Sequence, residues 1–214
     1  MSFVHLHLHT AFSFHQSSIR IDRLVAQCAD LGFRRCAITD ANTLAGAVRF
    51  YVAARAAGIT PILGCELTVH AEDGDDAVVL LARDLAGYSS LCRLVTCAQQ
   101  DRKHPGVTME QLGMHADGVI ALYGAPGGAL CRTLGERQEQ QAKELLRQMW
   151  TVFGTSLYLD VQNPLRTDSQ RMLYRYRELS RKTGVLACAT VPVVEEDRGG
   201  NQPAPAILIL DDSP

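Results

Sequence analysis

Basic residues are not in excess in this 214-residue sequence, in which 21 Lys and Arg side chains are balanced by 23 Asp and Glu side chains. Hydrophobic residues make up 47% and charged residues 21%, which is ordinary for a soluble globular protein. A protein that grips nucleic acid on its own usually carries a surplus of positive charge. The balance therefore predicts that any contact with DNA is local or supplied by a partner.

Several other signals are missing as well. No apolar run approaches the roughly 20 residues that a membrane-spanning helix needs, and no charged-then-apolar leader precedes the first apolar segment. The seven cysteines are scattered without a C-x-x-C pair, a distribution that favours buried, reduced thiols over a disulfide framework. Internal repeats and low-complexity linkers are lacking too. Together these absences predict a soluble, cytoplasmic protein without a membrane segment, built as a single domain.

Short apolar segments alternate along the chain with segments of helical period. The expected strands are 3–10, 35–40, 60–69, 77–82, 118–122, 157–161 and 185–190, and the expected helices are 21–31, 43–57, 86–99, 109–115, 135–153 and 169–183. This alternation predicts an α/β protein with a parallel sheet, and seven such units in about 200 residues favour a closed or nearly closed barrel. The barrel domain is expected over 1–196, followed by a tail over 197–214 with a short apolar docking segment at 207–210.

The segment Phe3–Thr10 carries a histidine at every second position. Successive side chains of a strand point to opposite faces, so His5, His7 and His9 are expected on one face and the apolar residues between them on the other. Imidazole is the commonest protein ligand of zinc and related metals, and three converging imidazoles predict a metal site. The alternative is an exposed edge strand whose histidines face water.

Polar residues follow the ends of several other expected strands. In barrels of this kind the reactive groups lie at the C-terminal ends of the strands. The residues expected to meet on that rim are His9, Asp40, Glu66, the Tyr123–Gly124 turn, Gln162 and Thr190.

Longer stretches resemble the polymerase-and-histidinol-phosphatase (PHP) family, in the version that opens the alpha subunit of bacterial replicative DNA polymerase III. The opening FVHLHLHT is similar to the first strand of that domain, and segment 19–69 follows its next three elements nearly residue for residue. The stretches LARDLAGYSSLCRLV, DGVIALYGAPGG and YLDVQNP resemble later elements in order and spacing. The similarity covers almost the whole chain, in which no polymerase palm, fingers or thumb sequence is present.

The resemblance implies a distorted, TIM-like (β/α)7 barrel whose rim holds up to three metal ions and hydrolyses phosphoesters, in some polymerases as a 3′–5′ exonuclease. His7, His9 and Glu66 match ligand positions of that rim. The remaining ligand positions of the family fall on residues that depart from its pattern, namely Gln16, Ala41, Ala125, Pro164, Pro192 and Val194. The resemblance therefore implies a degenerate site without an assigned catalytic residue, holding either no cofactor or a single zinc or manganese ion at reduced affinity.

Two functions stay open at this point. The first is a structural module in DNA replication that braces the polymerase core and carries the proofreading exonuclease subunit on an outer helical face, contacting DNA only indirectly. The second is a metal-dependent phosphoesterase or 3′–5′ exonuclease with one ion at His7, His9 and Glu66, because two His and one Glu form a known ligand set for catalytic zinc.

The segment 166–182 interleaves six basic residues with two tyrosines. It can face nucleic-acid phosphates, or it can be a solvated amphipathic helix. The helical interpretation is favoured, and its core-facing candidates are Met172, Leu173, Tyr176 and Leu179. His15 lies close enough to the first strand to replace a lost ligand, although a surface position is the default for it.

Overall fold

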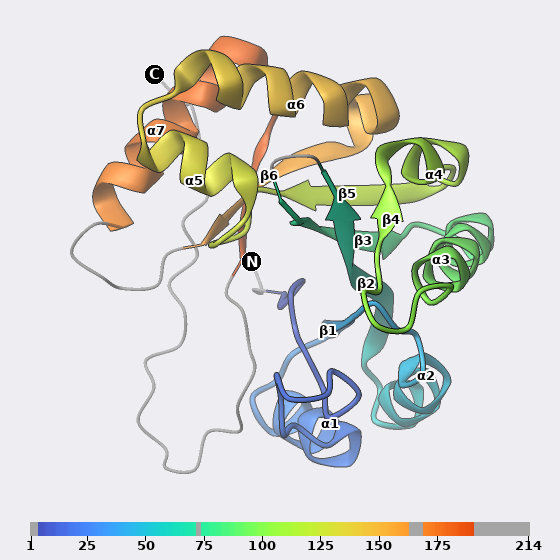
Figure 1. The fold of residues 1–214 in the computed structure, drawn as a ribbon. Coiled ribbons are helices and arrows are strands. Elements are labelled where there is room, and N and C mark those ends of the chain that lie inside the picture. The colour runs from blue at the N-terminus through green and yellow to red at the C-terminus, as the bar shows by residue number, and fades with distance from the viewer. Residues whose placement is uncertain (1–3, 72–73, 163–168, 191–214) are drawn as a thin grey trace.

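Seven strands form one mixed, curled sheet in the computed structural model, which describes residues 4–71, 74–162 and 169–190. The strands are β1 (Arg35–Ala41), β2 (Thr60–His70), β3 (Asp76–Ala82), β4 (Val107–Thr108), β5 (Val119–Tyr123), β6 (Leu157–Gln162) and β7 (Ala187–Thr190). Their order across the sheet is β1-β2-β3-β5-β6-β7, and β4 pairs with β2. Figure 1 shows the sheet curling into a half-barrel. The fold is the distorted (β/α) barrel that the sequence predicts.

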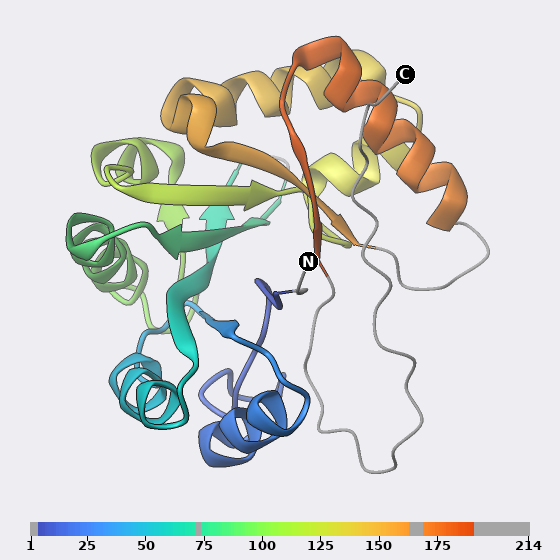
Figure 2. The same ribbon diagram turned by 180° about the vertical axis from the view of Figure 1, so that it is seen from behind.

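Helices lie around the outside of the curled sheet, as the two opposite views in Figures 1 and 2 show. They are α1 (Ile21–Asp30), α2 (Ala47–Ala56), α3 (Leu85–Ala98), α4 (Met109–Met114), α5 (Ala129–Gly135), α6 (Glu139–Phe153) and α7 (Ser169–Thr183), with a short 3-10 turn at Gly154–Ser156. In the described ranges, no helix combines the length and the apolar character needed to cross a bilayer. The basic helix α7 buries Tyr176 and Leu179, as the amphipathic interpretation predicts.

Strand β3 runs antiparallel to both of its neighbours, so the expectation of a fully parallel sheet is wrong at this strand. Only residues 71–75 separate β2 from β3, and this link is too short for the crossover that a parallel connection requires. The pairs β1–β2, β5–β6 and β6–β7 are parallel. The rim of the barrel therefore receives the C-terminal ends of the parallel strands and the beginning of β3.

Apolar side chains fill both faces of the sheet. Inside the curl, Ala37, Val79, Leu81 and Leu122 pack together, and Leu6 packs against them. A larger cluster lies between the sheet and helices α3 to α7, and a third cluster lies under α1 and α2. Each fully buried Leu or Val side chain contributes roughly 1.5–3 kcal/mol. This packing holds the strand ends, and the polar groups they carry, in fixed relative positions.

The opening segment, residues 4–10, lies beside β1 as an irregular stretch that bends at His7, rather than as the regular strand that the alternating pattern predicts. The Ala37 N–H donates to the His5 carbonyl at 3.0 Å, and the Thr39 N–H donates to the Leu8 carbonyl at 2.8 Å. Between these two hydrogen bonds the opening segment advances by three residues, from His5 to Leu8, whereas β1 advances by two, from Ala37 to Thr39. An extra residue of this kind interrupts the alternation of side chains between the two faces.

The interruption separates the first histidine from the other two. His5 packs edge-on against Phe33, with the ring centroids 5.2 Å apart. It is not a member of the ligand group formed by His7 and His9. The prediction that three imidazoles of the opening segment converge is therefore wrong for His5.

Candidate metal centre

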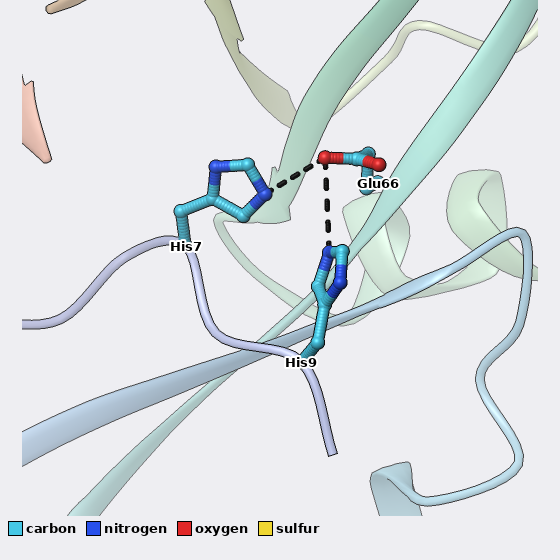
Figure 3. A group of neighbouring side chains, drawn as sticks. All are labelled: His7, His9 and Glu66. Atoms are coloured by element: carbon cyan, nitrogen blue, oxygen red, sulfur yellow. Dashed lines mark ion pairs between the residues drawn. The ribbon is translucent and has the colours of Figure 1, made fainter. Parts of the chain in front are cut away.

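Two imidazoles from the opening segment meet one carboxylate from β2, close to where β1 ends (Figure 3). His7 Nε2 lies 2.7 Å from Glu66 Oε2, and His9 Nε2 lies 3.7 Å from the same oxygen. The two rings are 5.2 Å apart between centroids and tilted by 59°. One ligand atom from each residue lies within 4.8 Å of the others. The structure thus brings together the three residues that the sequence predicts as metal ligands.

The backbone on either side of the second ligand histidine is held by β1. Thr39 Oγ1 accepts from the Leu8 N–H at 2.8 Å. The buried Asp40 carboxylate accepts from the Thr10 N–H at 2.6 Å, from the Thr10 hydroxyl at 2.8 Å and from the Ser13 hydroxyl at 2.7 Å. Three donors offset the cost of burying this carboxylate. The opening segment is therefore fixed although it is not a regular strand.

Asn42 fixes the carboxylate side of the group. It follows β1 with a positive φ of 52°, a conformation that Asn tolerates better than most residues. Its N–H donates to the Glu66 carbonyl at 2.8 Å, and its side chain exchanges two hydrogen bonds of 2.9 Å with Thr68. Gln99, the residue that follows α3, donates to the Asn42 carbonyl at 2.8 Å. These bonds anchor β2 at Glu66 and two residues beyond it, at Thr68.

The charges of the group are strongly coupled. Burial lowers the pKa of His7, but the carboxylates of Asp160 and Glu66 raise it more, to about 9. Burial raises the pKa of Glu66, while its contacts with His7 and His9 lower that pKa to about 2. At neutral pH the metal-free pair is therefore an imidazolium against a carboxylate. A metal ion bound between these two groups would take the place of that proton.

His9 offers buried nitrogen atoms that no described group satisfies. The ring is buried, and among the described residues neither Nδ1 nor Nε2 of His9 has a hydrogen-bond partner. An unpaired buried polar atom costs about 1–3 kcal/mol, which an ion on Nε2 would relieve. Two imidazole nitrogens and a carboxylate are a donor set that suits zinc or manganese. The Glu66 side chain is 21% exposed, so the group is reachable from solvent, and it fits a single divalent ion.

The side of His7 that faces away from Glu66 contacts a carboxylate that the strand-end pattern does not predict. Asp160 Oδ2 lies 3.6 Å from His7 Nδ1. Gln162 Nε2 lies 3.0 Å from His7 Nδ1 and donates to Asp160 Oδ2 at 3.0 Å. The Thr190 hydroxyl donates to Asp160 Oδ1. The signal in the sequence is an aspartate inside the apolar strand LYLDV, where a charged residue needs a buried partner.

The other residues expected on the rim have different roles. Gln162 and Thr190 join the network around Asp160, whereas Asp40 holds the opening segment. Tyr123 packs in the cluster between sheet and helices, and its hydroxyl donates to Asp76 at 2.6 Å. His15 is exposed and is not part of the ligand group, so the described structure does not make it a substitute ligand.

The positions at which the sequence departs from the PHP pattern add no ligand in the described part of the chain. Ala41 and Ala125 have only a methyl group as side chain, and Gln16 is exposed. Pro164, Pro192 and Val194 lie outside the described residues. Within the described ranges, the one group of metal-binding side chains that meets at ligand distances is His7, His9 and Glu66.

Residues 5–164 match the PHP domain family. The matched range contains both ligand histidines, Glu66, Asp160 and every strand from β1 to β6. The chain therefore belongs to the PHP domain family.

Bacterial DNA polymerases are among the relatives of this chain. The error-prone DNA polymerase of Symbiobacterium thermophilum is 32% identical over 92% of this chain and 20% of its own length. The DNA polymerase III alpha subunit of Pseudomonas aeruginosa is 32% identical over 89% of this chain and 17% of its own length, and that of Bacillus subtilis is 30% identical over the same shares. The chain thus spans a fifth or less of the length of these relatives.

Solved structures share the fold at low identity. A protein from Bifidobacterium adolescentis described as a metal-dependent phosphoesterase aligns over 87% of this chain and 86% of its own, with a TM-score of 0.60 and 14% identity. An amidohydrolase from Chromobacterium violaceum aligns over 91% of this chain and 88% of its own, with a TM-score of 0.62 and 16% identity. These similarities establish the shared barrel fold.

Proposed function

We propose that this chain is a PHP domain of the DNA polymerase III alpha type that acts in DNA replication as a structural and subunit-binding module, with a reduced metal site. The observation that carries the proposal is the ligand count on the rim. Three ligands meet there, while the described positions 41 and 125 carry alanine. Polymerase relatives at about 30% identity over most of the chain support the replication context.

The reduced ligand set removes the basis for multi-metal hydrolysis. A two-metal mechanism needs ions about 3.5–4 Å apart that clamp the attacking and the leaving oxygen. His7, His9 and Glu66 surround one position, and a methyl group at residue 41 or 125 has no lone pair to offer a second ion. Loss of a residue that only hydrogen-bonds to a metal ligand commonly weakens metal binding about 10- to 100-fold, and loss of a ligand itself weakens it more.

The proposed partners are a polymerase core and a proofreading exonuclease subunit, bound through the outer helices, with DNA reached only through them. We place residues 1–196 in the barrel domain and 197–214 in a tail that carries a short docking segment, and we place the protein in the cytoplasm. The nearly balanced charge of the chain supports indirect rather than direct contact with DNA.

Co-purification and hydrolysis assays test the proposal together. The full chain, tagged and purified without chelator, is mixed with the polymerase core and the exonuclease subunit of the same bacterium, and it is incubated separately with bis-p-nitrophenyl phosphate and a 3′-labelled oligonucleotide. We expect a stable complex and no hydrolysis above that of the double variant His7→Ala/His9→Ala. Absence of any complex, or hydrolysis that the double variant abolishes, would contradict a purely structural role.

The second candidate is a one-metal phosphoesterase or 3′–5′ exonuclease. It is favoured by the unsatisfied, buried nitrogens of His9 beside the partly exposed Glu66. A bound divalent ion would activate a water and polarise a phosphate, and His7, His9 and Glu66 would hold it. Thermal unfolding with and without zinc tests the site, because an ion at 100 times its Kd stabilises the folded state by about 2.7 kcal/mol. The zinc-induced shift should vanish in the double variant.

A further inference from the structure

A groove on the outer surface lies between α5, the start of α6 and the basic helix α7, which Figures 1 and 2 show grouped on one side of the sheet. Its volume is about 210 Å³, and a more open hollow continues it toward the N-terminal end of α7. Leu134 and Leu179 are its buried apolar lining, and the Tyr174 side chain borders both parts. Small-molecule sites usually enclose roughly 300–1,000 Å³, so this groove suits a few side chains of a peptide better.

The walls of the groove are held together by side chains of α7. Arg175 Nη1 donates to the Gly135 carbonyl at 2.9 Å and to the Leu134 carbonyl, both at the end of α5. Lys182 Nζ donates to Glu139 Oε1 of α6 at 2.9 Å. The groove is therefore formed before anything binds in it, and a preformed site loses less affinity to ordering.

The open end of the groove is basic. It is lined by Arg137, Arg171 and Arg175 together with Tyr174, whose side chain is 66% exposed. Among the ion pairs of the described residues, none joins Arg137 or Arg171 to a carboxylate, whereas the glutamates at the other end of the groove are paired with Lys182. Guanidinium groups bind carboxylates through paired hydrogen bonds, so this end fits an acidic occupant.

The sequence itself contains a segment with matching chemistry. Four apolar residues at 207–210 are followed directly by Asp211 and Asp212. Residues 191–214, which lie outside the described residues, carry five acidic side chains and one arginine, while α7 carries five basic side chains and one glutamate. An apolar run next to two carboxylates matches a groove with an apolar lining and a basic end.

The segment is also within reach of the groove. Helix α7 connects the parallel strands β6 and β7, so its N-terminal end lies toward the same end of the sheet as the last residue of β7, Thr190 (Figure 2). The 17 residues from there to Ile207 can span up to roughly 56 Å. The 15-residue helix α7 is only about 22 Å long. Attachment to the same chain gives an effective concentration in the millimolar range, at which even a weak site fills.

We propose that the groove between α5 and α7 is the docking surface of the chain's own segment 207–212. The apolar residues contact the lining beside Tyr174, and the two aspartates face Arg137 and Arg171. This inference rests on the docking segment of the proposed function, to which it assigns a binding site, and it is independent of the metal site.

Hydrogen–deuterium exchange of the full chain, followed by mass spectrometry, tests the docking. We expect the amides of 207–212 to exchange at least about tenfold more slowly than in a free synthetic peptide of residues 203–214. The double variant Arg137→Glu/Arg171→Glu and the single variant Tyr174→Ala should each remove this protection. About 1 M NaCl should weaken it in the wild type, because the Debye length falls to about 3 Å.

Arg23→Glu/Arg93→Glu is the matched control. It makes the same change of charge at exposed positions of α1 and α3, away from the groove. We expect the protection of 207–212 to stay within about twofold of the wild type in this control. Thermal unfolding of every variant verifies that the domain is folded.

Several outcomes would overturn the inference. Segment 207–212 exchanging as fast as the free peptide would exclude docking, and protection that survives both groove variants would place the segment elsewhere. Protection that appears only at high protein concentration would assign the groove to the tail of a second copy. A labelled single-stranded oligonucleotide that binds the wild type but not Arg137→Glu/Arg171→Glu, while the tail is unprotected, would assign the groove to nucleic acid.

The same material separates this inference from the proposed function. A stable complex with the polymerase core and the exonuclease subunit, together with an unprotected tail, would remove the docking inference alone. A protected tail in a protein that forms no such complex would remove the proposed replication role alone.

Discussion

Lowering the pH from 9 to 7 is expected to weaken zinc binding about 50-fold. The ion and a proton compete for His7, whose pKa is about 9 because two carboxylates outweigh the effect of burial. At pH 9 about half of the molecules have a neutral His7, and at pH 7 only about one in 100 does. At 1.36 kcal/mol per tenfold change, the competition therefore costs about 2.3 kcal/mol more at pH 7 than at pH 9. Glu66, with a pKa of about 2, stays ionised over this range. An ordinary histidine with a pKa near 6.5 would cause almost no loss above pH 7.

Calorimetric titrations at half-unit steps between pH 7 and 9 measure this dependence. Repeating the pH 7 titration in buffers of different ionisation enthalpy counts the protons released, and about one proton per zinc is expected. In Asp160→Asn one of the two carboxylates that raise the pKa of His7 is gone, so the dependence between pH 7 and 9 should flatten. A wild-type affinity that changes less than threefold over this range would refute the reasoning.

Two further predictions concern the metal-free protein. The raised pKa of His7 contributes stability that is complete below the unfolded-state pKa near 6.5 and is lost as the pH rises through about 9. The lowered pKa of Glu66 contributes stability that is present above the unfolded-state pKa of about 4.5 and is lost as the pH falls toward 2. The free energy of unfolding measured in urea should therefore contain the full contribution of the pair between about pH 4.5 and 6.5. Gly64→Ala should cost about 1–3 kcal/mol in the same assay, because the new Cβ would lie 2.3 Å from the Leu80 carbonyl oxygen. Gly113→Ala, whose Cβ would meet nothing closer than 3.9 Å, should be neutral or stabilising, and equal effects of the two substitutions would contradict the packing argument.

The hydrophobic pattern predicts six of the seven strands and most of the helices, because burial of one face imposes the period directly. It misses the short strand β4 and the helix α5, and it predicts a regular strand at 3–10 that the structure does not form. The expected strand 77–82 differs from β3 by one residue at its start. The pattern carries no information on strand direction, which here follows from the shortness of the link between β2 and β3. The helix expected over 135–153 begins only at Glu139. A separate helix, α5, ends at Gly135, and Arg137 adopts a positive φ of 63° between the two helices. No residue type in that stretch predicts this turn.

In the candidate site, too, some residues could be predicted from the sequence and others could not. His7, His9 and Glu66 are identified from spacing and from the PHP resemblance, and the structure brings them together. The separate position of His5 depends on one extra residue in the register against β1, which a strictly alternating sequence conceals. Asp160 depends on tertiary contact with a residue far away in the chain, and no local pattern encodes such a contact.

His7 connects parts of the chain that are synthesised at very different times. It contacts Glu66 on β2 and also Gln162 on β6, which is 155 residues away in the sequence. His7 and His9 are among the first residues to be synthesised, but the surroundings of His7 are complete only after β6 has been synthesised and has joined the sheet. An ion bound by His7, His9 and Glu66 would link the beginning of the chain to strand β2 of the sheet at the rim of the barrel. Metal retention would then report whether the whole barrel, rather than its first half alone, has been assembled.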